Sequence, residues 1–180
     1  MDTIKRDPLL LAAQILLWFF IGVLGLSLVA VAIGTPAAAI FQDRIIAEAA
    51  AKGITAGPEL VGAVLVILVA VAAFLALAIY FLVLLLRIVG SVKDGDPFVA
   101  INAERLSRMG WIALAGQVAM IPVGALLMWI AEITKDIENV HVDSDFGLNL
   151  EGILLVLILF ILARVFRQGA AMREDLEGTV

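Results

Sequence analysis

Long stretches without charged residues alternate with short polar segments along the chain. Three of these stretches run from residue 9 to 33, from 60 to 86 and from 110 to 131. At ~1.5 Å of rise per residue, roughly 20 helical residues cross a hydrocarbon core of about 30 Å. Each stretch is therefore long enough to cross a bilayer as a single helix.

A fourth stretch is shorter, because its uncharged part runs only from Gly152 to Ala163. It reaches the length of a span, at about residues 147–166, when Glu151 is included at one end and Arg164 at the other. A long arginine side chain can extend from such a position to the lipid headgroups. The pattern predicts an all-α membrane protein with four transmembrane helices in a single membrane domain, residues 1–180.

The segments between the first two stretches and after the third are predicted to lie outside. Thr35 and Pro36 have the character of a helix start, and Gly53 that of a helix end. This pattern predicts a short amphipathic helix, or an extension of the first span. In the second outer segment Val140 and Val142 alternate with polar residues, which favours a short strand or a β-hairpin.

The inner segment, residues 87–109, contains a turn signal at Asp94-Gly95. Asp96 is followed by Pro97, as in a helix N-cap with proline at the first position. The sequence predicts a cytoplasmic loop that ends there, and a helix that continues from there into the third span. The last 14 residues, 167–180, are predicted to form a cytoplasmic tail.

Basic residues fix the predicted orientation, because Lys and Arg near span ends accumulate on the cytoplasmic side. With a cytoplasmic N-terminus, three basic residues lie in outer segments and nine of the 12 in inner ones: Lys5, Arg6, Arg87, Lys93, Arg105, Arg108, Arg164, Arg167 and Arg173. We therefore expect both termini in the cytoplasm.

Composition restricts the chemistry further. The chain has no cysteine, and His141 is its only histidine, which excludes thiol catalysis and a multi-histidine metal site. The first three stretches contain no Asp, Glu, Lys, Arg or His, although ion and proton pathways need ionisable groups at membrane depth. A net charge of −5 gives no basic footprint for direct binding to nucleic acid. We expect no enzymatic activity, no cofactor and no metal.

Two cytoplasmic segments resemble a known family. They are Gly95-Asp96-Pro97-Phe98 with Asn102-Ala103-Glu104-Arg105-Leu106, and the ending from Ala163 to Gly169 with Asp175 to Val180. Both are similar to segments of the bacterial four-helix membrane family called domain of unknown function 2975. Members are often encoded beside a small helix-turn-helix regulator. The resemblance implies a protein of the bacterial inner membrane that binds or antagonises such a regulator.

The partner-binding residues predicted on this basis lie in the inner segment and the tail: Asp96, Pro97, Phe98, Asn102, Arg105, Arg164, Arg167, Asp175 and Glu177. Two other functions remain open. One is an oligomeric transport or channel component, against which the uncharged spans count. The other is a structural subunit of a larger membrane complex. Association with a second copy of the chain also remains open.

Overall fold

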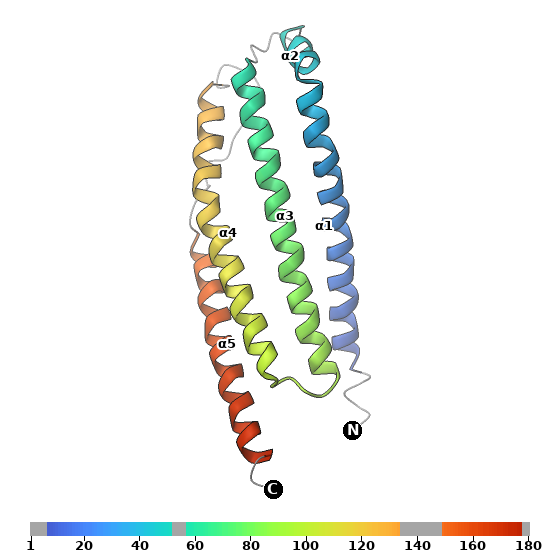
Figure 1. Ribbon diagram of the computed structural model, residues 1–180, viewed down its shortest axis with the longest axis vertical. Helices are drawn as coiled ribbons and strands as arrows, with labels where there is room; N and C mark the ends of the chain where they lie inside the picture. Colours follow the sequence, from blue (N-terminus) through green and yellow to red (C-terminus); the bar gives the residue numbers. More distant parts are fainter. Residues whose placement is uncertain (1–6, 52–56, 134–148, 178–180) are drawn as a thin grey trace.

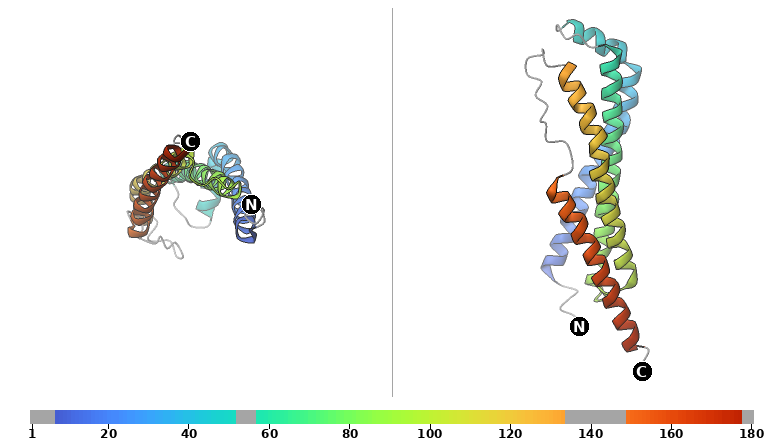
Figure 2. Two further views of the ribbon diagram at one scale, coloured as in Figure 1. Left: turned by 90° about the horizontal axis from the view of Figure 1, so that it is seen from below. Right: turned by 90° about the vertical axis from the view of Figure 1, so that its left-hand side faces the viewer.

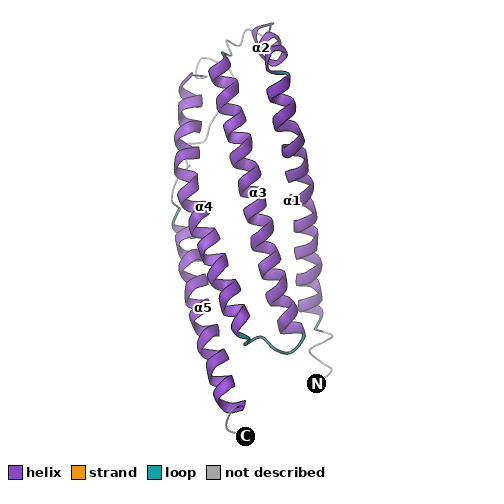
Figure 3. Ribbon diagram, viewed as in Figure 1, coloured by secondary structure: helices purple, strands orange, loops and turns teal. Residues whose placement is uncertain are grey.

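The computed structural model describes residues 7–51, 57–133 and 149–177. Within these ranges helices are the only regular secondary structure, and short loops join them (Figure 3). Five helices follow one another: α1 (Pro8–Ile40), α2 (Gln42–Ala51), α3 (Pro58–Lys93), α4 (Ala100–Ile133) and α5 (Leu150–Glu177). The predicted all-α class is confirmed. The β-hairpin predicted in the second outer segment lies outside the described residues.

Three of the described helices, α1, α3 and α4, are long and apolar enough to cross a membrane. Their starts follow simple rules. The Asp7 side chain accepts a hydrogen bond from the Leu9 amide at 2.9 Å, and Pro8 occupies the first turn of α1. Pro58 occupies the first turn of α3 in the same way. A backbone N–H in the first turn has no acceptor inside the helix, so proline, which has no N–H, loses no hydrogen bond there. The three helices support a multi-pass membrane protein.

The helix start predicted at Thr35 is wrong, because α1 continues through Pro36 to Ile40. The Thr35 hydroxyl donates to the carbonyl of Val31 at 2.8 Å, one turn earlier, and so caps nothing. A separate short helix, α2, follows at Gln42. The first outer segment thus contains both an extension of the first predicted span and a short helix.

The long helices form an open arc instead of a closed bundle. The main contacts join α1 to α3, α3 to α4, and α4 to α5. Seen along the helices, α1 and α5 lie at the two ends of the arc (Figure 2). Neighbouring helices are antiparallel, so α1 starts and α5 ends at the end that holds the α3–α4 loop, residues 94–99 (Figure 1). We call this the loop end.

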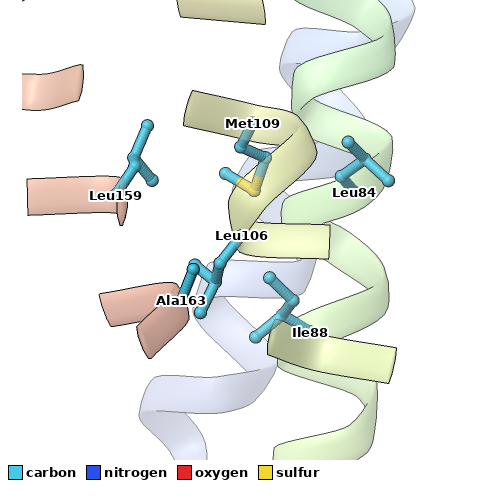
Figure 4. Close-up of a cluster of buried hydrophobic side chains, with 6 residues drawn as sticks. All are labelled: Leu84, Ile88, Leu106, Met109, Leu159 and Ala163. Atoms are coloured by element: carbon cyan, nitrogen blue, oxygen red, sulfur yellow. The ribbon is translucent and has the colours of Figure 1, made fainter. Parts of the chain in front are cut away.

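The hydrophobic core lies in the half of the molecule nearer the loop end. It consists of six buried side chains from three helices: Leu84 and Ile88 from α3, Leu106 and Met109 from α4, and Leu159 and Ala163 from α5 (Figure 4). Leu84 and Met109 are only 1% and 2% exposed. This cluster fixes α3, α4 and α5 to one another directly above the loop.

Helix α5 starts beside the middle of α4 (Figure 1). There the Gln117 side-chain amide donates to the Asn149 side-chain oxygen at 3.0 Å. That oxygen also accepts from the amide of Gly152 at 2.6 Å and so caps α5. The uncharged part of α5 therefore lies along only the half of α4 nearer the loop end, and α5 is not among the three helices that are long and apolar enough to cross.

Candidate functional site

The α3–α4 loop is short and tightly bonded to the end of α3. The amides of Asp94 and Asp96 donate to the carbonyls of Gly90 and Ser91, both at 3.0 Å. Between them Gly95 adopts a φ of 84°, a left-handed conformation that a side chain would strain. The turn signal at Asp94-Gly95 is confirmed, and it sends the chain back across the end of α3.

Asn102 holds the loop from the first turn of α4. Its side chain is 0% exposed. The amide nitrogen donates to the Ser91 hydroxyl at 2.6 Å and to the Pro97 carbonyl at 2.8 Å. One amide group thus connects α3, the loop and α4. Because it is buried, Asn102 positions the loop and presents no surface of its own.

Arg105 joins the same set of hydrogen bonds, and we call Ser91, Asn102 and Arg105 the polar junction. Its guanidinium donates to the Asn102 side-chain oxygen at 2.9 Å and to the Arg87 carbonyl near the end of α3 at 3.2 Å. Arg105 was predicted to bind a partner, and in the structure it binds the protein's own backbone. Among the described residues no buried side-chain nitrogen or oxygen lacks a hydrogen-bond partner, as buried polar groups require.

The other side of the loop is fixed to α5. The Asp96 carboxylate accepts from the guanidinium of Arg173 and forms an ion pair with it. The Phe98 ring lies 5.2 Å from that of Phe166, centroid to centroid, and also contacts Gly169. We call this set the loop–α5 contact. It joins residues about 70 positions apart in sequence, as the separation of 77 between Asp96 and Arg173 illustrates.

The loop–α5 contact explains why the predicted helix start at Asp96-Pro97 is wrong. Helix α4 begins at Ala100 instead. A carboxylate that caps a helix must turn toward the amides of the next turn. Asp96 instead directs its carboxylate to α5, and Phe98 packs on the same helix, so the residues between them stay non-helical.

A small groove opens at this contact. Its volume is about 290 Å³, and Asp96 and Phe98 line it from the loop while Ala170, Arg173 and Glu174 line it from α5. Phe98 is 44% exposed although it is aromatic. The groove therefore combines one apolar wall with side chains of both charges, a combination typical of protein recognition surfaces.

The remaining predicted residues also lie on α5, before and after the residues of the loop–α5 contact. Arg164, Arg167 and Asp175 are exposed. Glu177 is the last residue of α5, and its side chain lies outside the described part. Prediction from sequence did not select Arg173, Phe166 or Gly169 as site residues. Their signals were a spacing of three to four residues, which places them near one helix face, and for Phe166 and Gly169 a place in the family-like segment from Ala163 to Gly169.

A second, wholly different hollow lies on the inner side of the arc. It measures about 520 Å³ and is lined almost entirely by apolar side chains from α1, α3, α4 and α5, among them Phe20, Phe74, Phe81 and Leu155. The described residues include no group of three or more His, Cys, Asp or Glu side chains that could hold a metal.

Comparison with known families gives one result. The family described as "Protein of unknown function (DUF2975)" matches residues 42–180. No curated protein and no solved structure matches the chain. The matched range includes α2 to α5 and therefore every residue of the polar junction and of the loop–α5 contact.

Proposed function

We propose that this chain, which belongs to the DUF2975 family, is a regulatory membrane protein that binds a small cytoplasmic helix-turn-helix regulator at its loop end. Membership in this family explains why the inner loop and the tail resemble the corresponding segments of other members. The proposed binding surface consists of the groove beside Phe98 and the exposed part of α5 that follows it.

The proposal includes a topology with four spans and both termini in the cytoplasm. Nine of the 12 basic residues then lie on the cytoplasmic side, in agreement with the charge bias of membrane proteins. The fourth span would consist of residues 147–166, the first part of α5 and the residues just before it. This orientation exposes the loop end to soluble proteins of the cell.

The observation that carries the proposal is the groove itself. The Phe98 ring is 44% exposed and lines the groove together with both members of an ion pair, so an apolar contact and charged groups are offered at one place. Partner binding usually depends on a few such anchors within a polar rim. Phe98 offers the anchor, and Asp96, Arg173 and Glu174 offer the rim.

The rest of the loop end is suited to a binding surface that keeps its conformation when a partner binds. The polar junction of Asn102, Arg105 and Ser91 holds the loop before any partner arrives. A surface that is already ordered loses little conformational entropy on binding. The loop is thus suited to a rigid contact with a small folded protein.

The test is direct capture of a purified partner. The regulator encoded beside the gene would be produced with an affinity tag and incubated with the full chain in nanodiscs. We expect binding to the native chain, and at least tenfold weaker binding to F98A, because truncated anchor residues typically lose more than about 1.4 kcal/mol. F41A, at an exposed phenylalanine between α1 and α2, is the matched control and should bind as the native chain does.

Two outcomes would contradict the proposal. If the native chain retains none of the regulator, the regulatory function is wrong. If native chain, F98A and F41A retain it equally, the regulator binds elsewhere and the groove is not its site. The variants must first show the same helical content by circular dichroism.

A further inference from the structure

Arginines at the loop end fall into two groups. Arg105, Arg108 and Arg173 each bind another group of the protein: the Arg87 carbonyl, Glu104 and Asp96. The side chains of Arg87 on α3 and of Arg164 and Arg167 on α5 are exposed and have no hydrogen bond or ion pair with any described residue. Of these three, Arg164 and Arg167 are neighbours on one helix, and their charges serve no contact within the described structure.

Arg164 and Arg167 continue a face of α5 that carries aromatic and apolar groups. Phe160, Arg164 and Arg167 are spaced by four and three residues, so their side chains lie on one side of the helix. The Phe160 ring contacts Trp111 of α4 edge-on, with centroids 5.5 Å apart. Trp111 is 62% exposed. Tryptophan and arginine in this order are typical of the zone between hydrocarbon and headgroups.

Exposed apolar side chains precede the arginines on the same helix. Leu157 and Ile161 are 54% and 53% exposed, and they lie seven and three positions before Arg164. A surface of this kind suits acyl chains and not water. We call Leu157, Ile161, Arg164 and Arg167 the row. Its apolar side chains come first along α5 and its guanidinium groups follow, in the same order as the acyl chains and the phosphate of a lipid.

The loop–α5 contact leaves this row uncovered. Successive helical residues are about 100° apart, so Arg164 lies about 140° around α5 from Gly169, which Phe98 contacts. Arg164 and the Phe98 contact therefore use different sides of α5, whereas Glu174 of the groove lies seven residues after Arg167 on the side of the row. A ligand held at Arg164 would leave the Phe98 part of the groove uncovered.

We propose that Arg164 and Arg167, together with the Trp111–Phe160 pair, bind one anionic phospholipid of the inner leaflet. The guanidinium groups hold the phosphate through charge-assisted hydrogen bonds, for which the fork of arginine is well suited. The aromatic pair and Ile161 contact the glycerol and the first acyl carbons. The site rests on the cytoplasmic position of the loop end and does not depend on a helix-turn-helix partner.

The test uses native mass spectrometry of the full chain released from detergent after titration with phosphatidylglycerol or with zwitterionic phosphatidylcholine. We expect R164Q and R167Q each to weaken the binding of phosphatidylglycerol roughly fivefold, and the double variant about 25-fold. R44Q is the control, because Arg44 is an exposed arginine on α2 at the opposite end. Binding of phosphatidylcholine should be the same for all four variants and the native chain.

Each other outcome would overturn the site. Unchanged phosphatidylglycerol binding in the double variant would show that the arginines do not hold the lipid. An equal loss in R44Q would indicate a general effect of charge. Unchanged lipid binding combined with lost capture of the purified regulator would assign the row to a protein partner instead. A failure of regulator binding to the native chain would leave the lipid result intact, so the two proposals are tested separately.

Discussion

The Phe98 ring lies directly over Gly169, where α5 has no side chain to obstruct it. A Cβ added at Gly169 would come within 2.7 Å of Phe98 Cδ1. Real Cβ atoms do not approach so closely, and the ring is also held against Phe166. The loop therefore depends on glycine at this position of the helix.

Gly169→Ala is expected to loosen the loop. The Phe98 ring must shift from its place beside Phe166, and forced repacking of this kind typically costs about 1–3 kcal/mol. We expect a lower melting temperature in detergent. Gly22→Ala is the control, because a Cβ at Gly22 of α1 meets nothing within 4 Å and alanine favours a helix. Equal melting temperatures for the two variants would contradict the close contact.

Replacing Asn102 is expected to destabilise the loop end more than any surface change. Asn102→Ala leaves the Pro97 carbonyl without its donor and removes an acceptor of Arg105. Loss of a buried partner costs about 1–3 kcal/mol. The expected result is a clear decrease in thermal stability, measured by circular dichroism at a helical wavelength. A melting curve that matches the native protein would show that the junction contributes nothing.

A pair of serines tests the same junction more finely. Ser91 and Ser27 both donate to a carbonyl of their own helix, at 2.7 and 3.0 Å. Only Ser91 also accepts from Asn102, at 2.6 Å. Ser91→Ala should therefore lower the melting temperature, while Ser27→Ala should leave it almost unchanged. Equal effects would mean that the link between α3 and α4 is unimportant.

The Asp96–Arg173 pair should matter little for stability, since its side chains are 40% and 47% exposed. Exposed ion pairs are usually worth less than about 1 kcal/mol. We expect D96N and R173Q to shift melting only slightly, but to increase cleavage of the α5 end by added protease. The exchanged pair D96R/R173D should restore protection. E104Q breaks the Glu104–Arg108 pair on α4 and is the control. Lasting sensitivity in the exchanged pair would exclude a simple charge contact.

Gly152 is the most restrictive position at the start of α5. A Cβ there would lie 1.3 Å from the Gln117 side-chain nitrogen. Gly152→Ala should therefore displace Gln117 and break its hydrogen bond to Asn149. We expect G152A to lower the melting temperature clearly in the native background and less in Q117A, where the nearer obstruction is absent and only the Asn149 side-chain oxygen, at 2.7 Å from the added Cβ, remains. Equal losses in both backgrounds would contradict the contact.

Local pattern predicted the helical class, the three long apolar helices and the family, because each depends on nearby residues or on hydropathy. It failed where distant residues decide. Asp96 has the local character of a helix cap, but Arg173, 77 residues away, binds its carboxylate. Asn102 has the character of a surface residue, and the end of α3 buries it. The inner segment and the tail both contribute residues to the loop–α5 contact, but local pattern cannot show which of these residues meet.

Topology can be tested at three positions, because the chain has no cysteine of its own. Single cysteines would replace Asp43 of α2, Asp94 of the loop and Asp175 of α5, and a membrane-impermeant maleimide would be added to intact and to permeabilised cells. With four spans, D43C should react in intact cells, while D94C and D175C should react only after permeabilisation. If only α1, α3 and α4 cross, an odd number of crossings puts D175C on the same side as D43C. The contact of Arg173 with Asp96 argues against that result, because it holds the end of α5 at the loop. Labelling of D175C in intact cells would therefore overturn both the four-span topology and the loop–α5 contact in the membrane.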